Sequence, residues 1–455
     1  MPPSTPTKRA RALFGMSFMF VLLAFTRWGS YIGHNPIYIS DVLIVCAIIH
    51  WVLSGAQSER RPLDPVTRRP PPTIALSMFV GYVVLRALFS ATSEPILEIA
   101  RDAVPYLYGF VAFFSSRSYV RSSEADRAKT QRIVWIALIA HLAWLTPLVL
   151  LHHVAGLATL PGMDAPVFQV RPDIDSAISG VAGGLLLRRL LLGQGSRAWA
   201  IVGLVIATVD VLALYTRAGL VAYAAALIVA AFVTYSAMPK RDARRTALIL
   251  SVPAIVLIAA FILPQTTPGQ RLLATLRPTQ AATVQQESAV GTTRARETVW
   301  SGVISWVGQD NSRIVFGSGF GNDFLTQSGT IQYLEGTEYT GVRSPHDWFV
   351  GTYARVGLIG LALAVIVCLG LFRLIYVNRR HVGGDELQCL SALLIISILI
   401  VASLGVVLES PFGAIPFFWA AGVIYASRHQ GLENPNLRPS TDRSEKTSSA
   451  VALTG

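Results

Sequence analysis

Long apolar runs separated by short polar segments form the dominant pattern of this chain. Several runs approach the roughly 20 residues that an α-helix needs to cross the hydrocarbon core of a bilayer. The pattern predicts about twelve membrane-spanning helices, at residues 12–31, 36–55, 73–92, 99–116, 132–151, 174–193, 198–215, 218–236, 247–264, 350–377, 387–408 and 411–427. We therefore expect an all-α integral membrane protein.

One connection, residues 265–345, is far longer than the others. Loops of this length are usually functional or disordered. Order is favoured here because the stretch RARETVWSGVISWVG has apolar residues at roughly helical spacing and leads into the glycine-rich turn FGSGFGNDF. We expect this loop to be partly helical, with amphipathic helices lying over one membrane face.

We predict that the chain has four parts, namely the spans before the loop, the loop, the spans after it and a tail. Residues 1–264 hold the first nine predicted spans, residues 265–345 the loop, and residues 346–427 the last three spans. Residues 428–455 form a polar tail without an apolar period, which we predict to be disordered and cytoplasmic.

Basic residues predict the orientation of the spans, because Lys and Arg accumulate in short cytoplasmic loops. They cluster near the N-terminus and in every second connection, around residues 8–11, 60–69, 117–132, 188–197, 240–245 and 379–380. Both termini are thus predicted to be cytoplasmic and the long loop extracytoplasmic. The net charge of +12 has the same origin, so we do not interpret it as a nucleic-acid-binding surface.

Composition agrees with a membrane protein, since 52% of the residues are hydrophobic and 14% are charged. The three cysteines fall within or beside predicted spans, so we expect no disulfide framework.

The candidate functional residues are polar side chains at the outer ends of spans. His346 stands near the start of the tenth predicted span, in RSPHDWFVGTYARVGLIGL, where we expect its side chain to be exposed. On a continuous helix from His346, Gly357 and Gly360 would share its face and Arg355 would point away. Two glycines at this spacing would let another helix approach closely.

Other ionisable residues lie within or beside spans. Asp210 and Arg217 are seven residues apart, so they would share one face of a helix that continued through both. An ionisable group inside a span is a functional hypothesis. Glu409 lies at an outer helix end, just before the last span.

The Asp-x-Asp of PDIDS, Asp173 and Asp175, is a pattern that many metal-dependent glycosyltransferases use. We favour a different interpretation, in which Asp175 caps the sixth predicted span. The histidines lack metal-ligand spacing, and we expect no metal site.

In their order, these motifs resemble the O-antigen ligase and polymerase superfamily of membrane glycosyltransferases, which act on polyprenyl-diphosphate-linked glycans. TRAGL at a span boundary is similar to the family's SRG motif, R-x-x-x-W runs from Arg296 to Trp300, and GSGFGNDF is similar to the family's glycine turn. HDWFVGTYARVGLIGL and LESPFGAIPFFWAAG follow in the family's order. Thr216 and Asp347 depart from the family's usual serine and asparagine.

The resemblance implies roles for single residues. Arg217 and Arg296 would bind the donor diphosphate with their planar charged groups. His346 would orient the acceptor hydroxyl as a general base or hydrogen-bond acceptor. We also assign its neighbours Arg343 and Asp347 to substrate binding. Further candidates are Asp210, Arg294 and Glu409.

Each main candidate also has a structural interpretation. An interfacial histidine such as His346 can simply be a hydrated helix cap. Arg217 can extend along an apolar helix end to reach water. Arg296 can pair with Glu287 or Glu338 and do nothing more.

The resemblance implies inverting transfer without a metal or other cofactor, at a bacterial inner membrane. The expected partners are a polyprenyl-diphosphate-linked glycan donor, a glycan, lipid or protein acceptor, and membrane lipid, but no nucleic acid. We favour a polysaccharide polymerase, because nothing in the loop indicates a dedicated protein or lipid A acceptor; a ligase is the alternative. A lipid-linked glycan transporter is the rival from another class, although transporters typically show repeats and broken helices at the membrane midplane.

Overall fold

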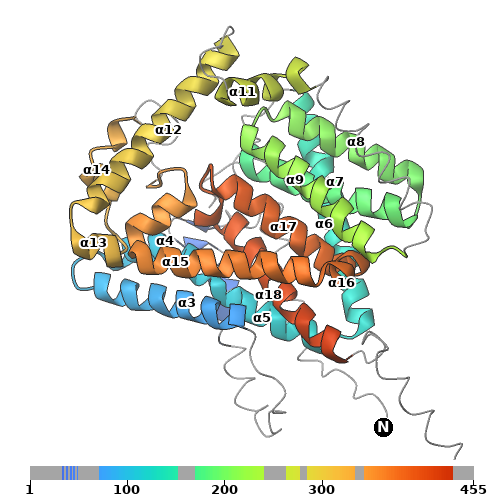
Figure 1. Ribbon diagram of the computed structural model, residues 1–455, viewed down its shortest axis with the longest axis horizontal. Coiled ribbons are helices and arrows are strands. Elements are labelled where there is room, and N and C mark those ends of the chain that lie inside the picture. Colours follow the sequence, from blue (N-terminus) through green and yellow to red (C-terminus); the bar gives the residue numbers. More distant parts are fainter. Residues whose placement is uncertain are drawn as a thin grey trace, which may run out of the picture.

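The computed structural model describes residues 71–151, 170–239, 263–276, 284–333 and 343–433, with short pieces between residues 33 and 49. Two-residue strands, β1 (Gly33–His34) and β2 (Ile37–Tyr38), pair antiparallel, and every other described element is a helix (Figure 1). The predicted spans at 12–31, 36–55 and 247–264 lie wholly or largely outside the described residues.

Among the described helices, four are long and apolar enough to cross a membrane. They are α3 (Pro71–Ser90), α6 (Glu124–Leu150), α9 (Arg217–Ala237) and α15 (Trp348–Val377). Each matches a predicted span, so the helical membrane class is confirmed. The total of twelve spans stays a prediction.

The remaining apolar helices complete the bundle. They are α4 (Ile96–Leu107), α5 (Gly109–Arg121), α7 (Pro172–Leu192), α8 (Arg197–Ala213), α17 (Glu386–Ala402) and α18 (Pro411–Glu433). Both α17 and α18 are buried along most of their length; α17 packs against α7, α9 and α18, and α18 packs against α5. These two helices therefore form the centre of the bundle.

Small residues on α7 allow its neighbours to approach closely. A Cβ added at Gly180 would lie 3.2 Å from the Cα of Tyr223 on α9, and one added at Gly184 would lie 2.8 Å from Leu393 on α17. Close backbone approach of this kind is how apolar helices associate where lipid removes the hydrophobic driving force.

Some predicted boundaries were wrong. The single span expected at 99–116 is two helices, because Pro105 removes a backbone donor from the end of α4 and α5 begins at Gly109, where an added Cβ would lie only 2.6 Å from Val80. The span expected to end at 408 ends at Ala402 and is followed by the turn η5 (Val407–Glu409).

The tail also begins later than predicted. Helix α18 continues through residue 427 to Glu433, so the first residues of the segment predicted to be disordered are helical. The sequence continues Asn434–Pro435. The rest of the tail lies outside the described residues.

The long segment between α9 and α15 is partly helical, as predicted. It contains the turns η2 (Leu263–Gln265) and η4 (Ile331–Tyr333) and the helices α11 (Thr267–Leu276), α12 (Val284–Gly308), α13 (Asn311–Phe316) and α14 (Phe324–Gln327). Helices α11 to α14 gather on one side of the molecule, and α16 (Arg379–Gly384) lies on the opposite side (Figure 1).

A stripe on α12 anchors this segment. Val299, Val303 and Val307 repeat every four residues and are fully buried with Phe324 of α14 and Ala354 of α15. The apolar face predicted for this amphipathic stretch thus packs against other helices of the protein.

The orientation of the bundle can be tested with two exposed positions. In a protein whose native cysteines are replaced, we expect Glu297→Cys on α12 to react with a membrane-impermeant thiol reagent in intact cells, and Lys129→Cys on α6 to react only after the cells are opened. The reason is the alternation of basic loops. Labelling of position 129 from outside would show that the assigned orientation is inverted.

Candidate active site

His346 lies at the bend that leads into α15. Its backbone amide donates a hydrogen bond to Ser344 Oγ (3.2 Å), and the residue is only 2% exposed. The expectation of an exposed histidine was therefore wrong. The helix begins at Trp348, and the residue that caps it is Asp347, whose Oδ1 accepts hydrogen bonds from the backbone amides of the first turn at 2.8 and 3.1 Å. Since Asp347 provides the cap, the structure does not support the view of His346 as a mere helix cap.

Backbone strain is found at two candidate motifs. Within the described residues, the non-glycine residues with positive φ are Tyr215 (+53°) and His346 (+59°). Tyr215 lies two residues before Arg217. Such conformations cost on the order of 1–3 kcal/mol each and are concentrated at functional sites.

The helix expected to run continuously from His346 is bent and then kinked. Gly357 interrupts α15 with φ +65° and ψ −166°. The glycine turn packs into this kink: the Ser318 amide donates to the Ala354 carbonyl (2.8 Å), and a Cβ at Gly357 would overlap the backbone of Gly317. Gly357 thus accommodates a loop backbone, where we had expected another helix.

Arginines from three helices meet beside the start of α9. Arg217 donates through Nη1 to the hydroxyls of Thr293 on α12 (2.6 Å) and Thr275 on α11. Arg271 of α11 donates to the backbone carbonyl two residues before Arg217 (3.1 Å). Arg296, about one turn beyond Thr293 on α12, is close enough to act electrostatically on Arg217.

Arg296 also acts on His346, together with Arg171 at the start of α7. Burial, followed by the charges of these two arginines, lowers the pKa of His346 to about 4. The imidazole is therefore neutral near pH 7 and can accept a proton or a hydrogen bond. We call Arg171, Arg217, Arg271, Arg296 and His346 the basic cluster.

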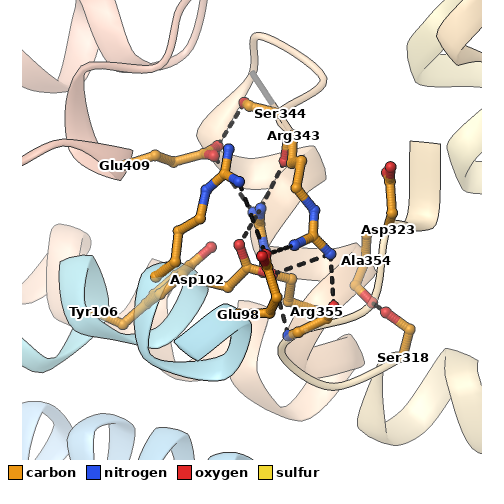
Figure 2. A network of polar contacts seen from close by, with 12 residues as sticks. Glu98, Asp102, Tyr106, Ser318, Asp323, Arg343, Ser344, Ala354, Arg355 and Glu409 are labelled. Atoms are coloured by element: carbon orange, nitrogen blue, oxygen red, sulfur yellow. Dashed lines mark hydrogen bonds and ion pairs between the residues drawn. The ribbon is translucent and has the colours of Figure 1, made fainter. Parts of the chain in front are cut away.

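A buried ion network lies next to the basic cluster (Figure 2). Arg355 is 3% exposed, and its Nη1 lies 3.4 Å from Glu409 Oε2 and its Nη2 3.8 Å from Asp102 Oδ1. Arg343 pairs with Glu98 and has its Nη2 3.8 Å from Asp102 Oδ2. The network thus joins α4, the segment before α15, α15 itself and η5.

This network holds the backbone that carries His346. Ser344 Oγ donates to Glu409 Oε1 (2.8 Å) and accepts from the His346 amide, while Arg355 Nη2 donates to the Arg343 carbonyl (2.7 Å). Burial raises the pKa of Glu409, and the charge of Arg355 opposes that rise. The prediction that Arg355 lies apart from this region was wrong, because the helix does not run continuously from His346.

The tryptophan of the R-x-x-x-W motif connects α12 to the same segment. Trp300 Nε1 donates to the carbonyl of Pro345 (2.7 Å). Arg296 is four residues earlier and therefore lies on the same face of α12. The motif thus places the charge of Arg296 and the Trp300 side chain, which holds the His346 segment, on the same face of α12.

Three other predicted residues have different surroundings. Asp210 is buried and accepts a hydrogen bond from Thr146 of α6 (3.0 Å); α8 ends at Ala213, so the face expected to be shared with Arg217 does not exist. The side chain of Arg294 is exposed on α12. Asp175 Oδ2 accepts from the Arg171 amide (2.6 Å), which agrees with a role at the start of α7.

Sequence reasoning missed Arg171, Asp102 and Ser344. Glu98 and Asp102 could have been noticed as acids at the start of a predicted span, but no motif marks Arg171. In the described part of the chain, no group of three His, Cys, Asp or Glu side chains is arranged as a metal site.

Comparison with known proteins adds one finding. Residues 202–365 match the family model described as O-antigen ligase. The matched region contains Arg217, Arg296 and His346 together with the helices of the long segment. No curated protein matches the chain.

Proposed function

We propose that this membrane protein transfers a saccharide from a polyprenyl-diphosphate donor to an acceptor glycan. The match of residues 202–365 to the O-antigen ligase family model supports placing the chain in the O-antigen ligase and polymerase superfamily. Transfer would take place on the extracytoplasmic side of a bacterial inner membrane. The observation that carries the proposal is the position of Arg296. It shares a face of α12 with Trp300, which donates to the Pro345 carbonyl beside His346 (2.7 Å), and its charge is close enough to affect both Arg217 and His346.

The arginines suit the donor. A diphosphate leaving group gains negative charge as the glycosidic bond breaks, and preorganised guanidinium groups stabilise that charge. Arg217 and Arg296 would hold the diphosphate, with Arg271 nearby. Arg343 and Asp347, which we assigned to substrate contact, would help by fixing the segment around His346, since Arg343 pairs with Glu98 and Asp347 caps α15.

The chemical step would be an inverting displacement. The acceptor hydroxyl oxygen forms a bond to the anomeric carbon, the bond from that carbon to the diphosphate oxygen breaks, and the electron pair leaves with the diphosphate. His346 takes the hydroxyl proton and later releases it to water. The step as proposed uses only the donor, the acceptor, water and side chains of this protein.

Donor binding would tune the base. Burial lowers the pKa of His346 to about 4, with a further contribution from the charges of Arg296 and Arg171, and this makes the imidazole a weak base before substrate arrives. A diphosphate held by Arg296 brings negative charge close to the imidazole and raises its pKa. His346 would thus become a stronger base when the donor is in place.

We favour polymerisation over transfer to a lipid or protein acceptor. Incubation of the purified protein with lipid-linked repeat units alone should give a ladder of longer lipid-linked chains, detected by mass spectrometry. A single product that appears only when a core oligosaccharide or protein is added would favour the ligase alternative. Movement of lipid-linked glycan across vesicles without any new glycosidic bond would favour a transporter.

A further inference from the structure

A small cavity of about 150 Å³ lies beside the buried ion network. Its charged lining consists of Arg101, Asp102, Arg171, Arg343, Arg355 and Glu409. The volume is well below the roughly 300–1,000 Å³ of pockets that enclose drug-sized ligands. The cavity therefore suits one charged head group and is too small for an oligosaccharide.

The charges of the lining favour an anion. Arg343 and Arg355 are paired with the three acids of the network, Glu98, Asp102 and Glu409. Arg101 also approaches Glu98, with Nη1 3.8 Å from Oε2. Four arginines therefore face three carboxylates, which leaves a formal excess of one positive charge at the cavity.

Arg171 is the cation of the cavity lining whose charge also acts on His346. Its guanidinium carbon lies 4.9 Å from the centre of the Phe412 ring, a cation–π contact that fixes the position of the side chain. Arg171 also acts on His346. An anion bound at Arg171 would therefore lie beside the candidate base.

The donor arginines belong to other elements. Arg217 and Arg296 lie on α9 and α12, whereas Arg101 and Arg171 lie on α4 and at the start of α7. None of the cavity's lining residues comes from α9 or α12. His346 is thus acted on by one arginine of each group, Arg296 of the donor arginines and Arg171 of the cavity.

We propose that this cavity binds an anionic group of the acceptor, and that Arg101 and Arg171 are its main ligands. The proposal rests on the proposed function, because it takes Arg217 and Arg296 as the donor site. The anion would be either the diphosphate of a second lipid-linked glycan or the carboxylate of an acidic sugar. For a polymerase, a second diphosphate site would hold the acceptor chain while its terminal hydroxyl meets the donor.

Titration of the full-length protein in nanodiscs of uncharged lipid tests the proposal. With inorganic pyrophosphate as the probe, isothermal calorimetry should give two equivalents for the wild type. The Arg101→Gln/Arg171→Gln variant should bind one equivalent, and so should Arg217→Gln/Arg296→Gln. The control variant Arg132→Gln/Arg197→Gln removes the same charge at exposed positions and should bind two.

The outcomes separate the two proposals. Wild-type binding of pyrophosphate by Arg101→Gln/Arg171→Gln would exclude the cavity as a diphosphate site, and wild-type binding of pyrophosphate by Arg217→Gln/Arg296→Gln would overturn the donor site alone. Of the substituted arginines, Arg101 contacts the Arg343–Arg355 network through Glu98, so unchanged thermal unfolding is needed to exclude misfolding as the cause of lost binding.

The source of the anion follows from a second titration with glucuronic acid. Loss of glucuronate binding in Arg101→Gln/Arg171→Gln, without loss of a pyrophosphate equivalent, would assign the cavity to an acidic sugar. Loss of the pyrophosphate equivalent alone would assign it to a diphosphate. If neither probe distinguishes this variant from the Arg132→Gln/Arg197→Gln control, the cavity does not bind anions.

Discussion

His346→Ala is expected to lower the rate of glycan transfer by about 100- to 10,000-fold, the range that a positioned general base contributes. The residue is almost fully buried, and it lies where Arg296 and Arg171 act on it. Single-turnover assays with excess protein over a labelled lipid-linked donor would measure the loss. Donor binding should remain, because the proposed diphosphate ligands are Arg217 and Arg296.

A second substitution separates the two possible roles of His346. Asparagine tolerates the positive φ at this position and can accept a hydrogen bond, but its side-chain amide cannot take a proton near pH 7. A base role predicts that His346→Asn is as inactive as His346→Ala. Near-normal turnover by His346→Asn would mean that the residue only orients the acceptor hydroxyl.

The pH dependence of the wild type provides the control. A base must be neutral, so activity should fall as the pH drops through the pKa of His346. That pKa is about 4 without substrate, and bound diphosphate should raise it. The acid limb for the donor-bound protein should therefore lie above pH 4. Residual activity of His346→Asn should show no such limb.

Arg355→Met should destabilise the protein by about 3–5 kcal/mol, the cost of breaking a buried ion pair from one side. The substitution leaves the Glu409 carboxylate buried beside Ser344 and removes one partner of Asp102. The midpoint of thermal unfolding of the purified full-length protein would measure this loss. The effect arises from uncompensated charge, since methionine fills much of the same volume.

A matched double variant tests that cause. Glu409→Gln keeps an oxygen for the Ser344 hydroxyl and removes the negative charge, so Arg355→Met/Glu409→Gln should recover part of the lost stability. Equal losses in the single and double variants would show that packing, and not charge, is responsible. Unchanged unfolding of Arg355→Met would contradict the structural role of the network.

Hydropathy was sufficient to predict α3, α6, α9 and α15, because a bilayer imposes a length and an apolar composition on each span. The order of short motifs indicated that Arg217, Arg296 and His346 act together. These predictions rest on local patterns, and each motif has its own recognisable residues.

The remaining features depend on contacts between distant segments. Glu98 and Arg343 are paired although a long stretch of chain separates them, and Arg355 meets Glu409 from another helix. No local pattern in the sequence indicates which distant residues form such pairs. The turn at Tyr215 separates Asp210 from Arg217, and no glycine marks it in the sequence.

The kink at Gly357 has a consequence for how lipid-linked substrates enter. Where α15 is interrupted, the carbonyls of Ala354 and Arg355 accept hydrogen bonds from the Ser318 and Gly319 amides at 2.8 and 2.9 Å, so the glycine turn completes the bonding of the broken helix. Hydrocarbon offers no replacement donor, and each orphaned carbonyl there costs several kcal/mol. Moving this turn away from α15 to open the site would therefore cost several kcal/mol of free energy for each carbonyl exposed. Under the proposed function, the polyprenyl chain of the donor would enter by a path along which the turn stays docked, with the turn and α15 as one fixed wall of the entrance.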